Sequence, residues 1–185
     1  LKIMKIFDCF MFYDEELLLD IRLNILDKYV DFFVIVESEH FHNGKKRQLK
    51  FDINKFKKFE SKIIYIVHKD EPVGITKLNN HDDEGTKSYK LILNAHLREN
   101  DQRNHISKGL TEADDNDLIL ISDVDEIPNL QSINLSKINN QIVIFEQIIF
   151  YYKFNRYLPN FNWHGTKACK KKNLLSPQWL RNIKN

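Results

Sequence analysis

Three carboxylates fall within four positions at the end of a short apolar run, LILISDVDEIP, residues 118–128. The apolar residues predict a buried strand, and open α/β sheets bind ligands beyond the carboxyl ends of their strands. Side chains alternate in extended backbone, so Asp123 and Asp125 can point the same way while Val124 points to the core. A carboxylate pair suits Mg²⁺ or Mn²⁺, and Mg²⁺ usually shares such a site with substrate phosphates. The motif therefore predicts a metal-bound diphosphate substrate.

The same residues have a structural interpretation. Asp123 could end the strand while Asp125 or Glu126 begins a helix whose first turn Pro128 fixes. For Glu126 we expect this helix-capping role in preference to a metal contact through water. In one interpretation the acids face a ligand site, and in the other they cap a helix. At a ligand site, two ionised carboxylates repel each other unless a cation lies between them.

The elements that must position these acids alternate along the chain. Apolar runs predict strands at 2–10, 31–38, 63–69 and 117–122, and amphipathic spacing predicts helices at 14–29, 51–62 and 88–110. Polar loops separate them, one turning at Gly44 and a longer one over 70–87. This order is typical of an α/β fold, a mostly parallel central sheet with helices on both faces. Further on, 141–154 predict a β-rich stretch and 158–174 an irregular, basic and aromatic segment.

Whole-chain composition limits the alternatives. The chain has 185 residues, 42% of them hydrophobic, which suffices for one domain with one core. Its net charge of +2 is uneven, because residues 127–185 carry nine Lys and Arg against one acid. No recognised motif indicates nucleic-acid binding. Residues 1–126 carry more Asp and Glu than Lys and Arg, and this negative charge would repel a nucleic acid. Cys9 and Cys169 have neither a disulfide framework nor zinc-site spacing, so we expect reduced thiols.

No apolar stretch approaches the roughly 20 residues of a membrane span. The N-terminal run LKIMKIFDCF is interrupted by Lys5 and Asp8 and has no small-residue cleavage site, so it predicts a strand and not a signal peptide. We therefore expect a cytoplasmic protein without stable membrane insertion.

Several motifs, taken in order, resemble glycosyltransferase family 17. They are KIFDCFMFYDEELLLDIRLNILDKYVDFFVIVES, the loop at Gly44 and Lys45, HLRENDQRNHI and LISDVDEIP, with a weaker continuation through WHGTKACKKKNLLSPQWLR. The resemblance implies a Rossmann-like GT-A fold, a UDP-sugar donor (UDP-N-acetylglucosamine for the characterised members), Mn²⁺ or Mg²⁺, inversion at the anomeric carbon and a glycan or glycoconjugate acceptor. We expect a single domain over 1–185, with the nucleotide sugar bound by 1–128 and the acceptor by 129–185.

By this resemblance, Asp123 and Asp125 correspond to the Asp-x-Asp signature, which holds a metal against the departing nucleoside diphosphate. Asp8, predicted where the first strand meets the first helix, and Glu37, at the end of the second strand, are candidates for nucleoside contacts. The structural alternatives are a helix-terminal charge for Asp8 and an exposed strand-end acid for Glu37.

Two arginines on the third predicted helix are candidate contacts to the diphosphate. Arg98 or Arg103 could reach its oxygens, which a guanidinium fork matches, or could brace the loop at Asp123. However, Glu99 with Arg103 and Arg98 with Gln102 are also i,i+4 pairs, so a solvated, salt-bridged helix face is the alternative.

An inverting transfer needs a base that takes the proton of the acceptor hydroxyl. Glu146 is the one carboxylate side chain after Glu126, and in so apolar a run it either pairs with a cation, such as a lysine of the tail, or is functional. His164 is a second candidate, as base or metal ligand, with aromatic packing as its alternative. The remaining basic residues, Lys167, Lys170, Lys171 and Lys172 near Trp163 and Trp179, could form the acceptor or phosphate side or a solvated surface.

Three functions stay open. A glycosyltransferase releases UDP, whereas a nucleotidyltransferase that uses the same acid pair releases pyrophosphate. A nucleotide-sugar or glycan-binding module without turnover is the third, because the chain reaches Asn185 without the Gly-Trp-His-Phe-Ser-like motif expected of relatives.

Overall fold

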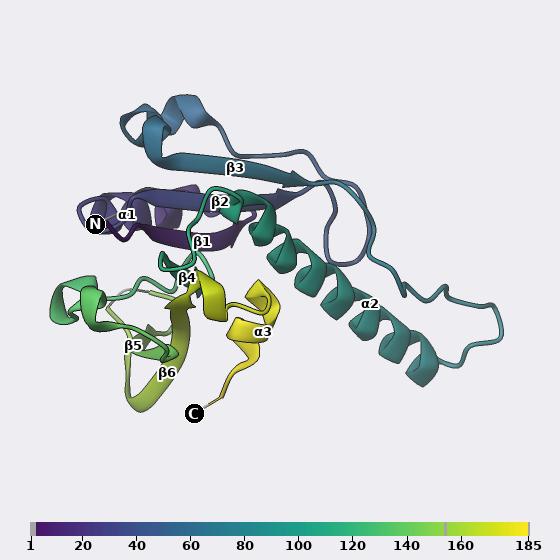
Figure 1. Cartoon of the computed structure of the whole chain (residues 1–185). Coiled ribbons are helices and arrows are strands. Elements are labelled where there is room, and N and C mark those ends of the chain that lie inside the picture. The colour runs from purple at the N-terminus through teal and green to yellow at the C-terminus, as the bar shows by residue number, and fades with distance from the viewer. Residues whose placement is uncertain (1–2, 154, 185) are drawn as a thin grey trace.

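One mixed sheet organises the residues that the computed structural model describes, 3–153 and 155–184 (Figure 1). Its six strands follow the order β3-β2-β1-β4-β6-β5. The parallel strands are β1 (Ile6–Phe12), β2 (Phe32–Ser38), β3 (Ile63–His68) and β4 (Leu118–Ser122), and β5 (Val143–Phe150) and β6 (Tyr157–Lys170) form an antiparallel edge. The predicted α/β class with a mostly parallel sheet is confirmed. Lys2 and Phe154, which the predicted strands included, lie outside the described residues.

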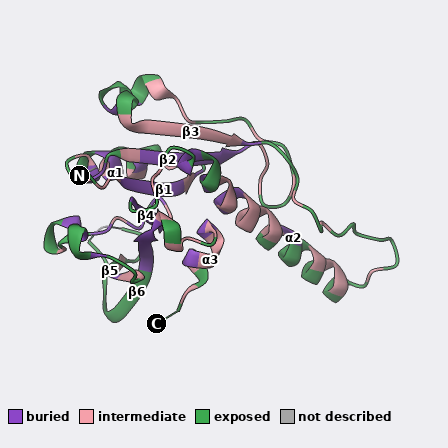
Figure 2. Ribbon diagram, viewed as in Figure 1, coloured by how far each residue is buried: buried purple, intermediate pink, exposed green. Residues whose placement is uncertain are grey.

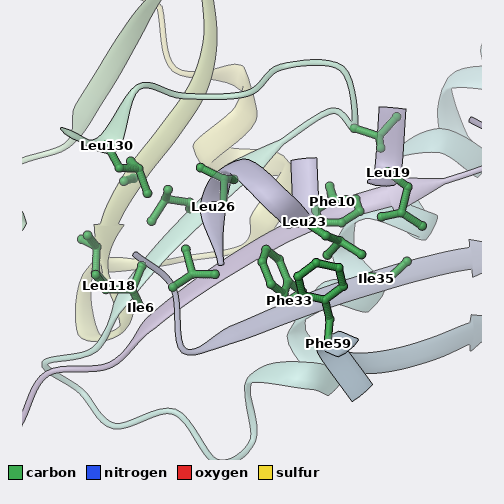
Figure 3. Packing of buried hydrophobic residues seen from close by; sticks show 14 of the residues in the cluster. Ile6, Phe10, Leu19, Leu23, Leu26, Phe33, Ile35, Phe59, Leu118 and Leu130 are labelled. Atoms are coloured by element: carbon green, nitrogen blue, oxygen red, sulfur yellow. The ribbon is translucent and has the colours of Figure 1, made fainter. Parts of the chain in front are cut away.

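Helix α1 (Glu16–Leu26) covers one face of this sheet. Its leucines at 19, 23 and 26 follow helical spacing and are fully buried, and Figure 3 shows them facing Phe10 of β1 and Phe33 of β2. Each such leucine contributes about 1.5–3 kcal/mol by leaving water. The 3₁₀ segment η1 (Ile53–Lys62) adds Phe56 and Phe59 to the same core, in place of the regular helix predicted for 51–62.

The opposite face is covered by shorter elements. The 3₁₀ turn η2 (His105–Leu110) and helix α3 (Pro177–Asn182) place Ile106, Leu110 and Leu180 on the second core cluster, against β1, β2 and β4. Both faces of the parallel strands are therefore buried, which explains why these strands are apolar without alternation.

Helix α2 (Glu84–Asn104) projects from the body, and its N-terminal half is largely exposed (Figures 1 and 2). It begins four residues before the predicted 88, because the Asp83 side chain accepts a hydrogen bond from the Thr86 N–H at 2.6 Å and so caps the helix. Within the described residues, neither α2 nor any other helix is long and apolar enough to cross a membrane.

The prediction that 158–174 is irregular is wrong. Strand β6 runs to Lys170 and is hydrogen-bonded on both sides, to β4 and to β5. This segment contains Pro159, Gly165 and several asparagines, which have low strand propensity, but pairing with two neighbours outweighs intrinsic preference. The remaining short 3₁₀ turns are η3 (Leu130–Ser132), η4 (Leu135–Lys137) and η5 (Lys171–Asn173).

Candidate functional site

The carboxyl end of β4 leads into a tight turn, Asp123–Glu126, hereafter the acid turn. The Glu126 N–H donates to the Asp123 carbonyl at 3.0 Å, and the Asp123 N–H donates to Oε2 of Glu126 at 2.8 Å. No helix begins at Asp125 or Glu126. The expectation that Glu126 caps a helix is therefore wrong, because its carboxylate closes the turn that contains it.

Arg22 of α1 anchors the backbone of the acid turn. Its guanidinium is fully buried and donates to the carbonyl oxygens of Asp123, Val124 and Glu126 at 3.1, 3.2 and 2.8 Å. Its other edge pairs with both oxygens of Asp8, at 2.7 and 2.8 Å. Arg22 thus satisfies the backbone carbonyl groups of the turn and does not bond the side chains of Asp123 and Asp125.

The position predicted for Asp8 needs correction. Because β1 continues to Phe12, Asp8 lies in the middle of that strand and not at its junction with α1. It is fully buried, and both its oxygens pair with Arg22. Asp8 therefore exposes no atom to a nucleoside, and it is also not a helix-terminal charge.

Two arginines hold the side chain of Asp123. Arg103 of α2 donates to Oδ1 at 3.0 Å, and Arg181 of α3 donates to Oδ2 at 2.7 Å. Arg181 also bonds Oε1 of Glu126 at 2.7 Å and the Gly165 carbonyl at 2.9 Å. Helices that are remote in sequence thus converge on one carboxylate, which remains 35% exposed. Arg103 lies where the bracing role predicted for it requires.

Asp125 differs from Asp123. It is exposed and forms no ion pair with any residue that the structure describes. Partial burial by its surroundings, and then the charge of Asp123, raise the pKa of its carboxyl group. A cation at Asp125 would remove this unfavourable charge, so the oxygen ligands present fit Mn²⁺ or Mg²⁺.

Both aspartates line a cavity of about 600 Å³ at the carboxyl edge of the parallel strands. Other walls come from the end of β1, the loop after β2 and the end of α2; the lining includes Tyr13, Arg47, Gln102, Arg103, Asp123 and Asp125. A volume of this size is within the range of small-molecule sites. The acids therefore face a ligand-sized space, as the ligand interpretation of the sequence requires.

Glu37 ends β2 as predicted, but it is fully buried and does not line the cavity. Its oxygens accept the N–H groups of Lys50 and Phe51 at 2.7 and 3.0 Å and pair with Arg47 at 3.0 Å. The Tyr65 hydroxyl donates a further bond at 2.8 Å, and burial, followed by this bond to Glu37, raises the pKa of Tyr65. Glu37 thus holds in place Arg47, a cavity residue.

Arg98 does not line the cavity. It pairs with Glu71 at 2.9 Å and donates to the His42 carbonyl at 3.0 Å. Its guanidinium packs over Gly44, whose φ of +84° is a backbone conformation that favours glycine. Arg98 fastens the loop after β2 to α2, and the structure brings only Arg103 of the two predicted arginines to the acid turn.

The candidate bases lie on the hairpin of β5 and β6. Glu146 and His164 are both exposed and are opposite each other in the register of the two strands. The neighbouring residue Phe145 is buried in the core. Neither Glu146 nor His164 lines the cavity.

The basic segment does not form one surface. Lys167 and Lys170 are buried and donate to the carbonyl groups of Arg181 and Asn116, and burial lowers the pKa of both. Lys170 pairs in register with Leu118, at the opposite end of β4 from the acid turn. Trp163 instead reaches the acid turn, where its Nε1 donates to Glu126 at 2.6 Å.

Sequence reasoning missed Arg22, Arg47 and Arg181. Arg22 had a usable signal, since it interrupts the apolar stripe of α1 at the helical spacing of Leu19, Leu23 and Leu26. The other two arginines had none, because their partners are known only once the fold brings distant segments together.

One of three comparisons with known proteins found a match. A model of glycosyltransferase family 17 matches residues 2–174, a range that contains the acid turn and the cavity residues described above. Searches of curated proteins and of solved structures returned no match. The chain belongs to glycosyltransferase family 17.

Proposed function

We propose that this glycosyltransferase depends on Mn²⁺ or Mg²⁺ and transfers N-acetylglucosamine from a UDP-sugar to a glycan or glycoconjugate acceptor, with inversion. We also propose that the sheet and its cavity represent a GT-A arrangement in which the donor binds at the carboxyl edge. The observation that carries the proposal is Asp125, exposed and without an ion pair among the described residues, beside Asp123 on the wall of a 600 Å³ cavity.

The two aspartates have different parts in this proposal. Both oxygens of Asp123 already accept arginine hydrogen bonds, so the capacity to hold a cation falls mainly on Asp125. A bound cation would offset the charge that the diphosphate gains as it leaves. Arg103 and Arg181 keep Asp123 in a fixed position, since charge-assisted bonds from two helices hold it.

The acceptor side of the proposal rests on the hairpin. During transfer, the acceptor oxygen bonds to the anomeric carbon while the bond to the diphosphate oxygen breaks, and a base takes the hydroxyl proton. We propose Glu146 for this base, because it is exposed beside His164 on strands that lead to the acid turn through Trp163 and Thr166. Glu146 does not line the cavity, so this role requires the anomeric carbon of the bound donor to lie at the cavity edge nearest the hairpin, with the attacking hydroxyl within hydrogen-bond reach of Glu146.

The test is Asp125→Asn, compared with wild type and with Asp70→Asn, an exposed loop acid, as the matched control. We expect Mn²⁺-dependent binding of UDP, measured by titration calorimetry, to weaken about 100-fold in Asp125→Asn only, because a metal ligand is lost. The free energy of unfolding should not fall, since the substitution relieves repulsion with Asp123.

A panel of sugar nucleotides, with Mn²⁺ present or chelated, identifies the reaction. Release of UDP supports the proposal, and release of pyrophosphate would identify a nucleotidyltransferase. Mn²⁺-dependent UDP binding with no transfer to any acceptor would indicate a binding module. Equal binding and turnover by Asp125→Asn and wild type would remove Asp125 from the site.

A further inference from the structure

A second group of potential metal ligands lies outside the lining of the cavity. His68 ends β3, Asp101 lies in the last turn of α2, and His105 begins η2. One ligand atom from each lies within 4.8 Å of the others. Oδ2 of Asp101 is 2.7 Å from Nε2 of His68, and the imidazole rings of His68 and His105 meet edge to face with their centroids 4.3 Å apart.

Hydrogen bonds orient both histidines. Nδ1 of His105 is 3.0 Å from the Asp101 carbonyl, which can only accept, so this nitrogen carries the proton and Nε2 of His105 keeps its lone pair. Nδ1 of His68 is 3.1 Å from the Ser38 hydroxyl, and this leaves Nε2 of His68 to face Asp101. An imidazole whose far nitrogen is fixed by a protein group is the usual arrangement around a bound metal.

His40 supplies an independent observation. Its N–H donates to the same Ser38 hydroxyl at 3.1 Å, which brings it to the edge of the group. Nδ1 of His40 is buried and has no hydrogen-bond partner among the residues that the structure describes. A buried polar atom without a partner costs free energy, so a group that satisfies it would stabilise the fold.

We propose that His68, Asp101 and His105 bind a Zn²⁺-type transition-metal cation at a site distinct from the acid turn. Two imidazole nitrogens and one carboxylate oxygen suit Zn²⁺, whereas the all-oxygen pair Asp123 and Asp125 suits Mg²⁺ or Mn²⁺. Three protein ligands leave one position of a tetrahedral ion open for water.

The position of the site gives the metal a structural role. It would link the end of β3 to the base of α2, the part of this projecting helix that joins the body (Figure 1). Gln102 and Arg103 lie between the ligands Asp101 and His105, and Arg103 holds Asp123. The ion would therefore stabilise the folded chain and fix the helix end that supports the acid turn.

The test uses the full chain after a chelator has removed bound metal. Competition with a chromogenic chelator measures the stoichiometry and affinity of Zn²⁺ binding. The Tm is then measured with and without Zn²⁺. Wild type and His81→Gln, which changes an exposed loop histidine, should bind one Zn²⁺ and gain Tm. His105→Gln and Asp101→Asn should bind about 100-fold more weakly and gain none. Asp125→Asn should keep the Zn²⁺ site, so this proposal and the proposed function can fail separately.

Binding of Co²⁺ to wild type provides a second test that does not depend on whether the variants fold. A tetrahedral Co²⁺ ion gives intense visible absorption bands, and extended X-ray absorption on the same sample reports imidazole ligands. Tetrahedral bands with two imidazoles support the site. Their absence in wild type, or Zn²⁺ binding by His105→Gln and Asp101→Asn equal to that of wild type, would overturn it.

Discussion

The acid turn and the outer part of the β5–β6 hairpin are built in opposite ways. Around the turn, charged groups such as Arg22, Asp8 and Arg103 are buried and hydrogen-bonded to other side chains or to backbone. The hairpin instead exposes aromatic side chains, and Figure 2 shows its tip as exposed. These side chains are Phe150, Tyr151, Tyr152, Tyr157, Phe161 and Trp163. The buried charged groups of this fold thus fix the position of one turn, while the neighbouring surface depends little on any single side chain.

The largest effect should come from Arg22→Met. This change leaves Asp8 as an unpaired buried charge and removes the donors of three carbonyl groups, so we expect a loss of about 3–5 kcal/mol of unfolding free energy. Chemical denaturation followed by circular dichroism measures it. Arg156→Met, in the exposed hairpin, is the control and should stay within about 0.5 kcal/mol of wild type.

The double variant Arg22→Met with Asp8→Asn sharpens the same contrast. It should regain part of the loss, because no buried charge remains uncompensated. If Arg22→Met costs no more than Arg156→Met, the buried ion pair does not distinguish the two regions.

An intermediate effect is expected from Gly165→Ala, where β6 crosses the acid turn. A Cβ atom there would lie 2.2 Å from Oε1 of Gln147 and 2.8 Å from Cδ of Glu126, both held by hydrogen bonds of their own. We expect a loss of about 1–3 kcal/mol in the same denaturation experiment.

Gly85→Ala is the matched control for this change. Its Cβ would lie 3.5 Å from the Asp83 side chain, which is ordinary contact, in the first turn of α2. It should be neutral or stabilising by up to about 1 kcal/mol. Equal stability of the two alanine variants would mean that β6 is not packed tightly against the acid turn at Gly165.

The smallest effect should come from Tyr152→Asn at the hairpin tip. Tyr152 is 88% exposed and has φ of +63°, a conformation that asparagine tolerates better than tyrosine. We expect the unfolding free energy to change by no more than about 0.5 kcal/mol. A loss above about 1 kcal/mol would show that the tip packs as firmly as the turn.

The sequence predicts the location of the acids well but not the groups that hold them. Asp123 and Asp125 follow a strand whose apolar run and alternation are local signals. Their support is not local, since Arg22 and Arg181 are 101 and 58 residues from Asp123. Arg98 and Arg103 show the same limit, because they share a helix and differ only in remote partners, Glu71 for one and Asp123 for the other.

The fold follows the same division. The buried parallel strands and α1 are predicted, because periodicity and apolar runs are properties of neighbouring residues. Strand β6 is not, since its pairing with β4 and β5 depends on contacts that its own composition does not indicate. The start of α2 is also not predicted. The helix begins earlier than expected because Asp83 caps it, and the acidic run that contains Asp83 resembles a loop in the sequence.

The buried Arg22 also ties the order of synthesis to the formation of the turn. Its partner Asp8 emerges from the ribosome 14 residues earlier, but the carbonyl groups that complete its hydrogen bonds emerge more than 100 residues later. Until those residues are made, the hydrogen bonds from Arg22 to the turn cannot form, so the contacts that bury Arg22 beneath α1 are completed only after residue 126. Complete burial of Arg22 in the core therefore requires that the acid turn has already formed.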